Sequence, residues 1–209
     1  AAVNVLCRTL GIGLRVVDAG CKGGAFPAHP VLTECRLGDG TANMATGPAM
    51  TEQACIAGLL AGMDLAAEAV AAGARCLGIG EMGIGNTTAA SALFSAWLGL
   101  DPRQLTGPGT GLNGEGVRRK ADVIARALSV NAGALRSGDP VSVLAALGGF
   151  EIAVMAGVVL GAAAARVPCL VDGFIAQSAY LAALKLCPAV RAYTFVAHAS
   201  AEPGSAVLL

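Results

Sequence analysis

The segment ARCLGIGEMGIGNT, residues 74–87, decides the fold because a short apolar run in it ends in a glycine-rich turn. Residues 74–80 have the length and apolarity of a buried parallel strand, and the stretch 87–99 after the turn is typical of a helix. Asn86 and Thr87 both carry side chains that can cap this helix. A strand that turns directly into a helix is the repeating unit of an α/β fold.

The turn fits two nucleotide-binding templates, and each match has a defect. GEMGIGNT, residues 80–87, has Asn86 where a Walker A loop needs the lysine that neutralises phosphate charge. GIGEMG, residues 78–83, matches the dinucleotide fingerprint, but Asp101, the acid at the right spacing, follows a helix where a strand is required. An NTPase and a Rossmann oxidoreductase are therefore disfavoured, while a purely structural tight turn stays open.

Three features favour a binding turn over a purely structural one. Glu81 places a carboxylate in the turn, the following helix starts with polar residues 86–88, and a second glycine-rich connection, GPGTG, occupies residues 107–111. The free N–H groups at a helix start favour an anion. The pattern predicts a site for a mononucleotide or sugar phosphate with one carboxylate beside it.

Strand and helix patterns alternate along the whole chain. The pattern predicts a single α/β domain over residues 1–209, an open parallel sheet with helices on both faces. The predicted strands are 14–18, 74–80, 168–173 and 191–200, with a loop and one short strand in 21–47. The predicted helices are 51–73, 87–99, 117–128, 140–147, 150–167 and 174–188.

Polar residues follow several of these strands. Ligands bind beyond the carboxyl ends of the strands in open α/β sheets. We therefore expect Asp18, the turn 80–87, Asp172 with Gly173, and residues 198–200 to lie together.

Composition argues against a nucleic-acid or membrane partner. The 209 residues are 55% hydrophobic, and 14 basic residues balance 14 acidic ones without forming blocks of one sign. The longest uncharged apolar run, 152–165, is shorter than the roughly 20 residues that a spanning helix needs.

The cysteines indicate the cellular compartment, and the chain ends indicate whether the sequence is a fragment. Seven scattered cysteines indicate free thiols in a reducing cytoplasm, without a disulfide framework or a metal site. The chain opens without Met on what reads as the middle of a helix, so we expect a fragment or a trimmed form, and no signal peptide is recognisable.

Several separate motifs resemble, in the same order, the nicotinate-nucleotide:dimethylbenzimidazole phosphoribosyltransferases of cobalamin biosynthesis. The resemblance covers essentially the whole chain. The motifs are VVDAG (16–20), PAMT (48–51), GEMGIGNTTAASAL (80–93), GPGTGL (107–112), LGGFEIAVMAGVVLGAA (147–163), VDGFI (171–175) and HASAEPG (198–204).

This resemblance implies a reaction and an architecture. The phosphoribosyl group of nicotinate mononucleotide would move to 5,6-dimethylbenzimidazole, giving α-ribazole 5'-phosphate and nicotinate, without a metal or other cofactor. The family fold is a Rossmann-like large domain with a small helical domain built from both chain ends, and the enzyme is a homodimer. The present chain would correspond to the large domain, with the small domain mostly absent.

The resemblance also assigns site residues. It places Glu81, as the catalytic or charge-stabilising acid, with Met82 and Gly83 at the junction of base and ribose. Lys120 would supply the positive charge that the false Walker loop lacks. The phosphate cradle and its adjoining loop would comprise Gly85, Asn86, Thr87, Thr88, Gly109, Thr110 and Gly111. Further substrate contacts are expected at Asp172, Gly173, His198 and Ser200.

One departure from the family pattern leaves an alternative open. The family's general base is a Glu in a GEGTG-like segment after SAEPG, and that segment lies outside these 209 residues. A truncated, non-catalytic remnant that binds a mononucleotide is therefore the alternative to the transferase.

Overall fold

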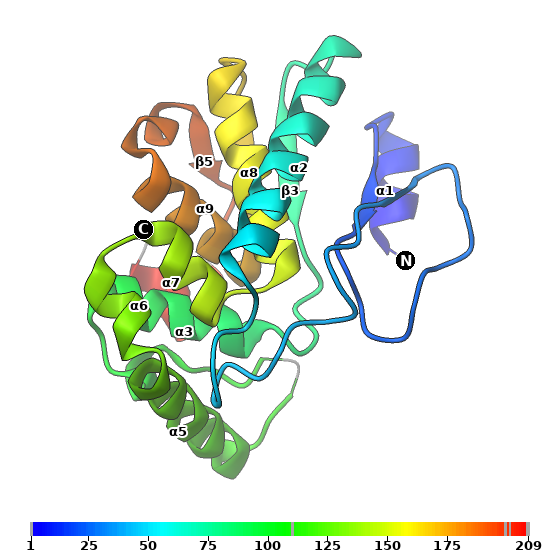
Figure 1. The fold of residues 1–209 in the computed structure, drawn as a ribbon. Coiled ribbons are helices and arrows are strands. Elements are labelled where there is room, and N and C mark those ends of the chain that lie inside the picture. Colours follow the sequence, from blue (N-terminus) through cyan, green and yellow to red (C-terminus); the bar gives the residue numbers. More distant parts are fainter. Residues whose placement is uncertain (1, 110, 199, 201, 208–209) are drawn as a thin grey trace. The chain divides into compact units, whose positions relative to one another are not determined.

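The computed structural model describes residues 2–109, 111–198, 200 and 202–207. The chain divides into two compact units, Ala1–Gly40 and Thr41–Leu209. The first contains α1 (Ala2–Leu10), β1 (Val16–Asp18) and β2 (Leu32–Glu34). The second contains, in chain order (Figure 1), α2 (Glu52–Ala71), β3 (Leu77–Gly80), α3 (Thr87–Leu98), α4 (Pro102–Leu105), α5 (Gly114–Val130), α6 (Ala132–Ser137), α7 (Pro140–Leu147), α8 (Phe150–Ala164), β4 (Cys169–Asp172), α9 (Phe174–Leu186), η1 (Pro188–Tyr193), β5 (Thr194–Val196) and η2 (Pro203–Val207).

In the first unit, the end of β1 is tied into its own loop. Asp18 accepts hydrogen bonds from the N–H groups of Gly20 and Cys21 and pairs with Arg36 at 2.8 Å. Burial alone would raise the pKa of Asp18, but the hydrogen bond from Arg36 and the two backbone N–H groups outweigh it and hold that pKa below its usual value. Asp18 therefore serves the internal structure of the loop.

The prediction that the strand ending at Asp18 belongs to the same sheet as the other site strands is wrong. Within the described residues β1 pairs in parallel with β2, in a sheet separate from the one formed by β3, β4 and β5. The sequence pattern does not reveal which strands pair, and the short strand expected in 21–47 turns out to be the partner of β1.

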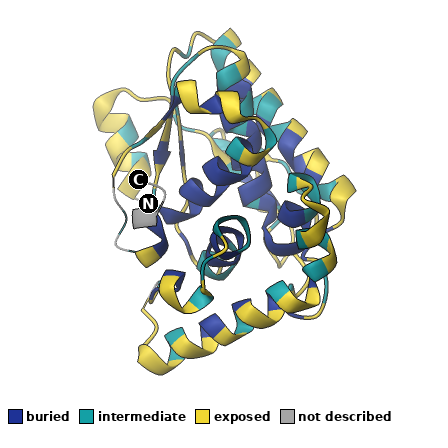
Figure 2. Ribbon diagram, turned by 90° about the vertical axis from the view of Figure 1, so that its left-hand side faces the viewer, coloured by how far each residue is buried: buried dark blue, intermediate teal, exposed yellow. Residues whose placement is uncertain are grey.

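The second unit is organised around β3, β4 and β5, which pair in parallel in that order. Ile79 lies opposite Val171 in register, and both side chains are buried on the face covered by α8 and α9. Figure 2 shows how strongly burial concentrates in the helices of this unit. The register also brings Gly80 at the end of β3 opposite Asp172 at the end of β4.

The helices α2 and α8 run side by side (Figure 1) and approach closely at glycines. A Cβ atom on Gly157 would lie 2.1 Å from the carbonyl oxygen of Leu59, and one on Gly62 would lie 2.0 Å from that of Val154. No side chain fits at either position, so the two backbones pack directly against each other. The small residues of the segment 150–167 serve this contact.

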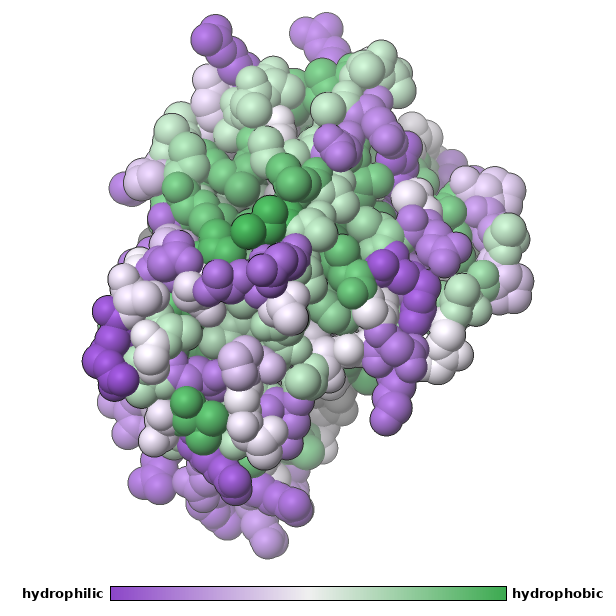
Figure 3. Space-filling view, in the orientation of Figure 1, coloured by the Kyte–Doolittle hydropathy of each residue, from purple (hydrophilic) through white to green (hydrophobic). Residues whose placement is uncertain are grey.

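The outer side of α2 is apolar. Figure 3 shows hydrophobic side chains at the surface over this helix, where Ile56 and Leu60 are exposed. Among the described residues α2 is the one helix whose length and hydropathy would suffice to cross a membrane, a test that core helices of soluble proteins also pass. α2 carries the exposed acids Asp64 and Glu68 and packs along α8 with its other side.

Helix starts were predicted better than the last strand. Thr51 accepts a hydrogen bond from Ala54 N and caps α2, and Asp139 caps α7 through Val141 N and Ser142 N, in agreement with the predicted helix starts at 51 and 140. The predicted strand 191–200 is wrong at both ends, because Pro188–Tyr193 form the 3-10 helix η1, which begins with a proline, and β5 covers only Thr194–Val196.

The glycine contact between α2 and α8 predicts a loss of stability in Gly157→Ala. Overpacking in a closely packed core costs about 1–3 kcal/mol, which lowers the melting temperature by about 2–12 °C in a domain of this size. Differential scanning calorimetry measures the change. The control is Gly133→Ala in α6, where an added Cβ has no atom within 4 Å, and a gain of about 0.4–1 kcal/mol is expected. Equal melting temperatures for Gly157→Ala and the wild type would contradict the direct backbone contact.

Candidate functional site

The glycine-rich turn between β3 and α3 has the geometry that its sequence predicts. Gly83 and Gly85 have φ values of 81° and 85°, a backbone region that residues other than glycine rarely adopt. Within the turn the N–H of Gly83 donates to Oε2 of Glu81. The Glu81 carboxylate is thereby folded over the turn, and the residue remains exposed.

Asn86 occupies the N-cap position of α3 but does not cap it. Within the described part of the chain its side chain makes no cap hydrogen bond, and its backbone angles of −104° and −1° differ from the extended geometry of an N-cap. Instead Nδ2 donates to Oε1 of Glu151 over 3.1 Å, while Oδ1 is buried and lacks a partner among the described residues. The expectation that Asn86 caps α3 is therefore wrong, because a tertiary hydrogen bond holds its amide.

Lys120 reaches the start of α3 from the first half of α5. Its Nζ donates to Oγ1 of Thr87 over 2.8 Å and to the carbonyl oxygen of Gly107 over 3.3 Å, and the residue is 6% exposed. Burial lowers the pKa of Lys120, and the nearby carboxylate of Glu202 partly opposes this effect. The structure thus brings a buried ammonium group to the helix start that the sequence singled out.

The second glycine-rich connection lies against the same helix start. Gly109 has φ 56°, and a Cβ on it would lie 2.8 Å from Oγ1 of Thr87 and 3.7 Å from Nζ of Lys120. Its N–H donates to Oε1 of Glu202 over 2.8 Å. Thr110, the middle predicted residue of this loop, lies outside the described residues.

Glu202 is a site residue that sequence reasoning missed. A Cβ on Gly107 would lie 2.1 Å from Oε2 of Glu202, so the carboxylate fits against a glycine on one side and holds Gly109 N on the other. Its place in the motif HASAEPG could have singled it out. No local sequence pattern, however, predicts its hydrogen bond with Gly109, which lies 93 residues earlier in the chain.

Glu151 is an acidic residue in the first turn of the otherwise apolar helix α8. Burial raises the pKa of its carboxyl group above the usual value. The hydrogen bond from Asn86 and its own backbone N–H act in the opposite direction, and the charge of Glu81 adds to the rise. Two carboxylates, Glu81 and Glu151, are therefore close enough to interact at the start of α3.

Asp172 and His198 form a second group at the strand ends. Oδ1 of Asp172 and Nδ1 of His198 are 3.1 Å apart, and Gln177 Nε2 donates to the carbonyl oxygen of His198. Gly173, with φ 88°, is the N-cap residue just before α9, and Ser200 N donates to Oγ of Ser205. Gly80, opposite Asp172 in register, connects this group to the turn.

The remaining predicted residues lie at the rim of the turn and loop. Met82 is 72% exposed, Gly111 is exposed, and Thr88 is half-buried in the first turn of α3. Among the described residues none of these three makes a contact that assigns it a role, so their substrate contacts stay predictions.

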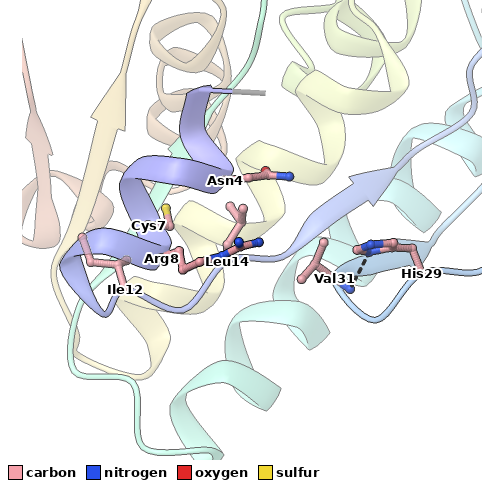
Figure 4. Close-up of a pocket in the computed structure, with 7 residues that line it drawn as sticks. All are labelled: Asn4, Cys7, Arg8, Ile12, Leu14, His29 and Val31. Carbon is pink, nitrogen blue, oxygen red and sulfur yellow. Dashed lines mark hydrogen bonds between the residues drawn. The ribbon is translucent and has the colours of Figure 1, made fainter.

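The described surface also contains two hollows lined by other residues. One lies within the unit 1–40 (Figure 4), where Val31 N donates to Nδ1 of the exposed His29. It is lined by Asn4, Cys7, Arg8, Ile12, Leu14, His29 and Val31. A second lies over α4 and α5 beside the surface ion pair of Arg103 with Asp122. Neither contains a residue of the helix start.

The chemistry of the helix start suits an anion. It combines uncapped backbone N–H groups, the hydroxyl group of Thr87 and the ammonium group of Lys120. Helix N-termini favour negative charge, and a phosphate monoester matches this set of donors. The described residues contain no group of three or more His, Cys, Asp or Glu side chains arranged for a metal ion.

Known proteins resemble the chain over its full length. A family model described as phosphoribosyltransferase matches residues 1–209. The protein of Nitratidesulfovibrio vulgaris (strain Hildenborough) named nicotinate-nucleotide–dimethylbenzimidazole phosphoribosyltransferase is 58% identical over 98% of this chain and 57% of its own length. The protein of that name from Solidesulfovibrio magneticus is 55% identical over 100% of this chain and 59% of its own length.

A solved structure agrees in fold. The crystal structure of CobT from Thermus thermophilus superimposes with a TM-score of 0.91 at 41% identity, covering 100% of this chain and 62% of that one. This likeness confirms the predicted Rossmann-like α/β class, a parallel sheet flanked by helices. The chain spans 57–59% of the length of the curated relatives named above. With the family model matched from end to end, the chain belongs to the phosphoribosyltransferase family whose curated members carry the name nicotinate-nucleotide–dimethylbenzimidazole phosphoribosyltransferase.

Proposed function

We propose that the protein transfers the phosphoribosyl group of nicotinate mononucleotide to 5,6-dimethylbenzimidazole, giving α-ribazole 5'-phosphate and nicotinate. The observation that carries the proposal is the ammonium group of Lys120 beside Thr87 at the uncapped start of α3. A buried cation and a helix start together provide strong recognition of a monophosphate. The names of the relatives supply the two substrates.

In the proposed reaction the substrate is held at its phosphate and stabilised at its ribose. The bond between C1' of the ribose and the pyridinium nitrogen breaks, and its electron pair stays on that nitrogen. Nicotinate leaves with an uncharged pyridine ring. A ring nitrogen of dimethylbenzimidazole forms the new bond to C1', and the proton on its other nitrogen passes to a general base. Binding of the remote phosphate holds the ribose for this attack. Glu81, in the turn next to the phosphate site, stabilises the positive charge that develops on the ribose.

The partners and compartment belong to the same proposal. Homodimerisation is proposed from the family resemblance alone. A cytoplasmic location is supported by the cysteines, which in the described residues are free thiols, Cys55 and Cys169 among them buried. Burial raises the pKa of both of these thiols to about 12, so they stay protonated and unreactive.

Two measurements test the function separately. Calorimetric titration with nicotinate mononucleotide measures binding, and chromatographic detection of α-ribazole phosphate after addition of dimethylbenzimidazole measures transfer. Binding together with transfer is expected. Binding without transfer would favour the alternative of a non-catalytic mononucleotide-binding protein, and the absence of binding would contradict both.

Lys120→Met is expected to weaken binding of nicotinate mononucleotide about 10- to 100-fold, because a hydrogen bond to a charged group contributes about 1.5–3 kcal/mol. The exposed Lys185 near the end of α9 provides the control, and Lys185→Met should bind like the wild type. Unchanged affinity in Lys120→Met would remove Lys120 from the phosphate site.

Glu81→Gln is expected to reduce kcat about 100- to 1000-fold, as loss of one electrostatic contact to a transition state typically does. Because the charge on the ribose develops in the transition state, affinity for nicotinate mononucleotide should change little. Single-turnover kinetics with saturating acceptor measures the effect. A rise in KM at constant kcat would instead assign Glu81 to ground-state binding.

The affinity for nicotinate mononucleotide should fall at alkaline pH. Burial lowers the pKa of Lys120 below the usual 10.5, so its charge is lost at a lower pH than that of an ordinary lysine as pH rises through that lowered value. The phosphate has its second charge well below this range, since its pKa is about 6. Titration calorimetry between about pH 7.5 and 10 should show the fall in the wild type, while Lys120→Arg should keep its affinity. A fall of equal size in both proteins would attribute the effect to another group.

A further inference from the structure

The carboxylate of Glu151 is held in place independently of any substrate. It lies at the first turn of α8, where its own backbone N–H acts on it as a hydrogen-bond donor. The preceding Gly149 makes room for it, because a Cβ there would lie 2.5 Å from Oε2 and 2.6 Å from Oε1. The carboxylate thus has a defined position from which it accepts the hydrogen bond of Asn86.

This hydrogen bond decides the orientation of the Asn86 amide. A carboxylate accepts hydrogen bonds, so Asn86 must present its NH2 group and turn Oδ1 away from Glu151. Oδ1 then lies buried without a partner among the described residues. An unpaired buried oxygen is unfavourable, so the amide is retained in this position by the bond to Glu151.

The position of the amide matters because asparagine is among the best N-cap residues. A capping Asn86 would shift its backbone from angles of −104° and −1° to the extended region and direct Oδ1 to the N–H of Thr88 or Ala89, the second and third residues of α3. Those are the groups that an anion at the helix start would need. A self-capped helix would occupy its own anion site.

We propose that Glu151 is a positioning residue that holds the Asn86 carboxamide away from the first turn of α3 and thereby keeps that turn free for the phosphate of the substrate. The role depends on the proposed function, since the phosphate is that of nicotinate mononucleotide. Glu151 acts through Asn86, 65 residues away in the chain, and makes no contact with substrate itself.

Titration calorimetry with nicotinate mononucleotide and thermal unfolding of the same samples test this role. Glu151→Leu releases the amide, and its affinity should fall about 5- to 30-fold, the effect of a competing N-cap of ordinary strength. Its melting temperature should stay equal or rise, since α3 gains a cap. Glu151→Gln keeps an oxygen that can accept from Asn86 and should bind like the wild type.

Three further variants separate the proposed role from a structural one. In an Asn86→Ala background, Glu151→Leu should have no further effect on affinity, because Ala has no amide to redirect. Gly149→Ala displaces the carboxylate without removing it and should lower affinity as Glu151→Leu does. Glu52→Leu, a change of an exposed first-turn glutamate that accepts from Ser142 Oγ in α7, should leave affinity unchanged.

The outcomes are distinct from those that test the function. If the wild type fails to bind nicotinate mononucleotide, the proposed function fails. If the wild type binds and Glu151→Leu binds equally well, the positioning role is wrong. If Glu151→Leu lowers the affinity equally in the wild-type and in the Asn86→Ala background, Glu151 does not act through that amide. This result would also overturn the positioning role.

Discussion

The burial of the Lys120 ammonium group is the constraint on which the candidate site depends. A charge at 6% exposure is unfavourable unless polar groups surround it, and here Thr87 Oγ1 and the carbonyl oxygen of Gly107 accept its hydrogen bonds. These two contacts tie α5, the start of α3 and the second glycine-rich loop to one atom. The lowered pKa of Lys120 reflects the remaining desolvation cost of burying this charge, which a bound dianion would offset.

Glycines make this convergence sterically feasible. Gly109 brings its backbone so close to Thr87 that a Cβ would lie 2.8 Å from the hydroxyl oxygen, and Gly107 leaves room for the carboxylate of Glu202. The same principle operates in the scaffold, where Gly62 and Gly157 allow α2 and α8 to pack backbone against backbone. Glycine therefore has two uses in this chain: it adopts positive φ, as at Gly83 and Gly85, and it allows close approach, as at Gly62 and Gly157.

Much of the architecture could be predicted from local sequence, whereas the partners of the site residues could not. The strand, glycine turn and helix of residues 74–99 follow from apolarity and turn chemistry, and Thr51 and Asp139 cap helices as their residue types predict. Local chemistry fails at Asn86, where a hydrogen bond to Glu151 outweighs the capping preference. The pairing of β1 with β2 was missed for the same reason, because it is a tertiary choice. Lys120 was found through the family motif and not through its spacing from the turn.

Two acids, Glu151 and Glu202, lie beside the candidate phosphate site. Both carboxylates hold donors that would otherwise be free to move: Glu202 takes the N–H of Gly109, and Glu151 takes the amide of Asn86. In each case a glycine beside the carboxylate, Gly107 or Gly149, leaves the space that it occupies. Negative charge near an anion site weakens binding, but a fixed arrangement of donors reduces the reorganisation that binding requires. Each of these acids, from a distant part of the chain, therefore takes up a donor beside the start of α3 and fixes the polar groups around that helix start.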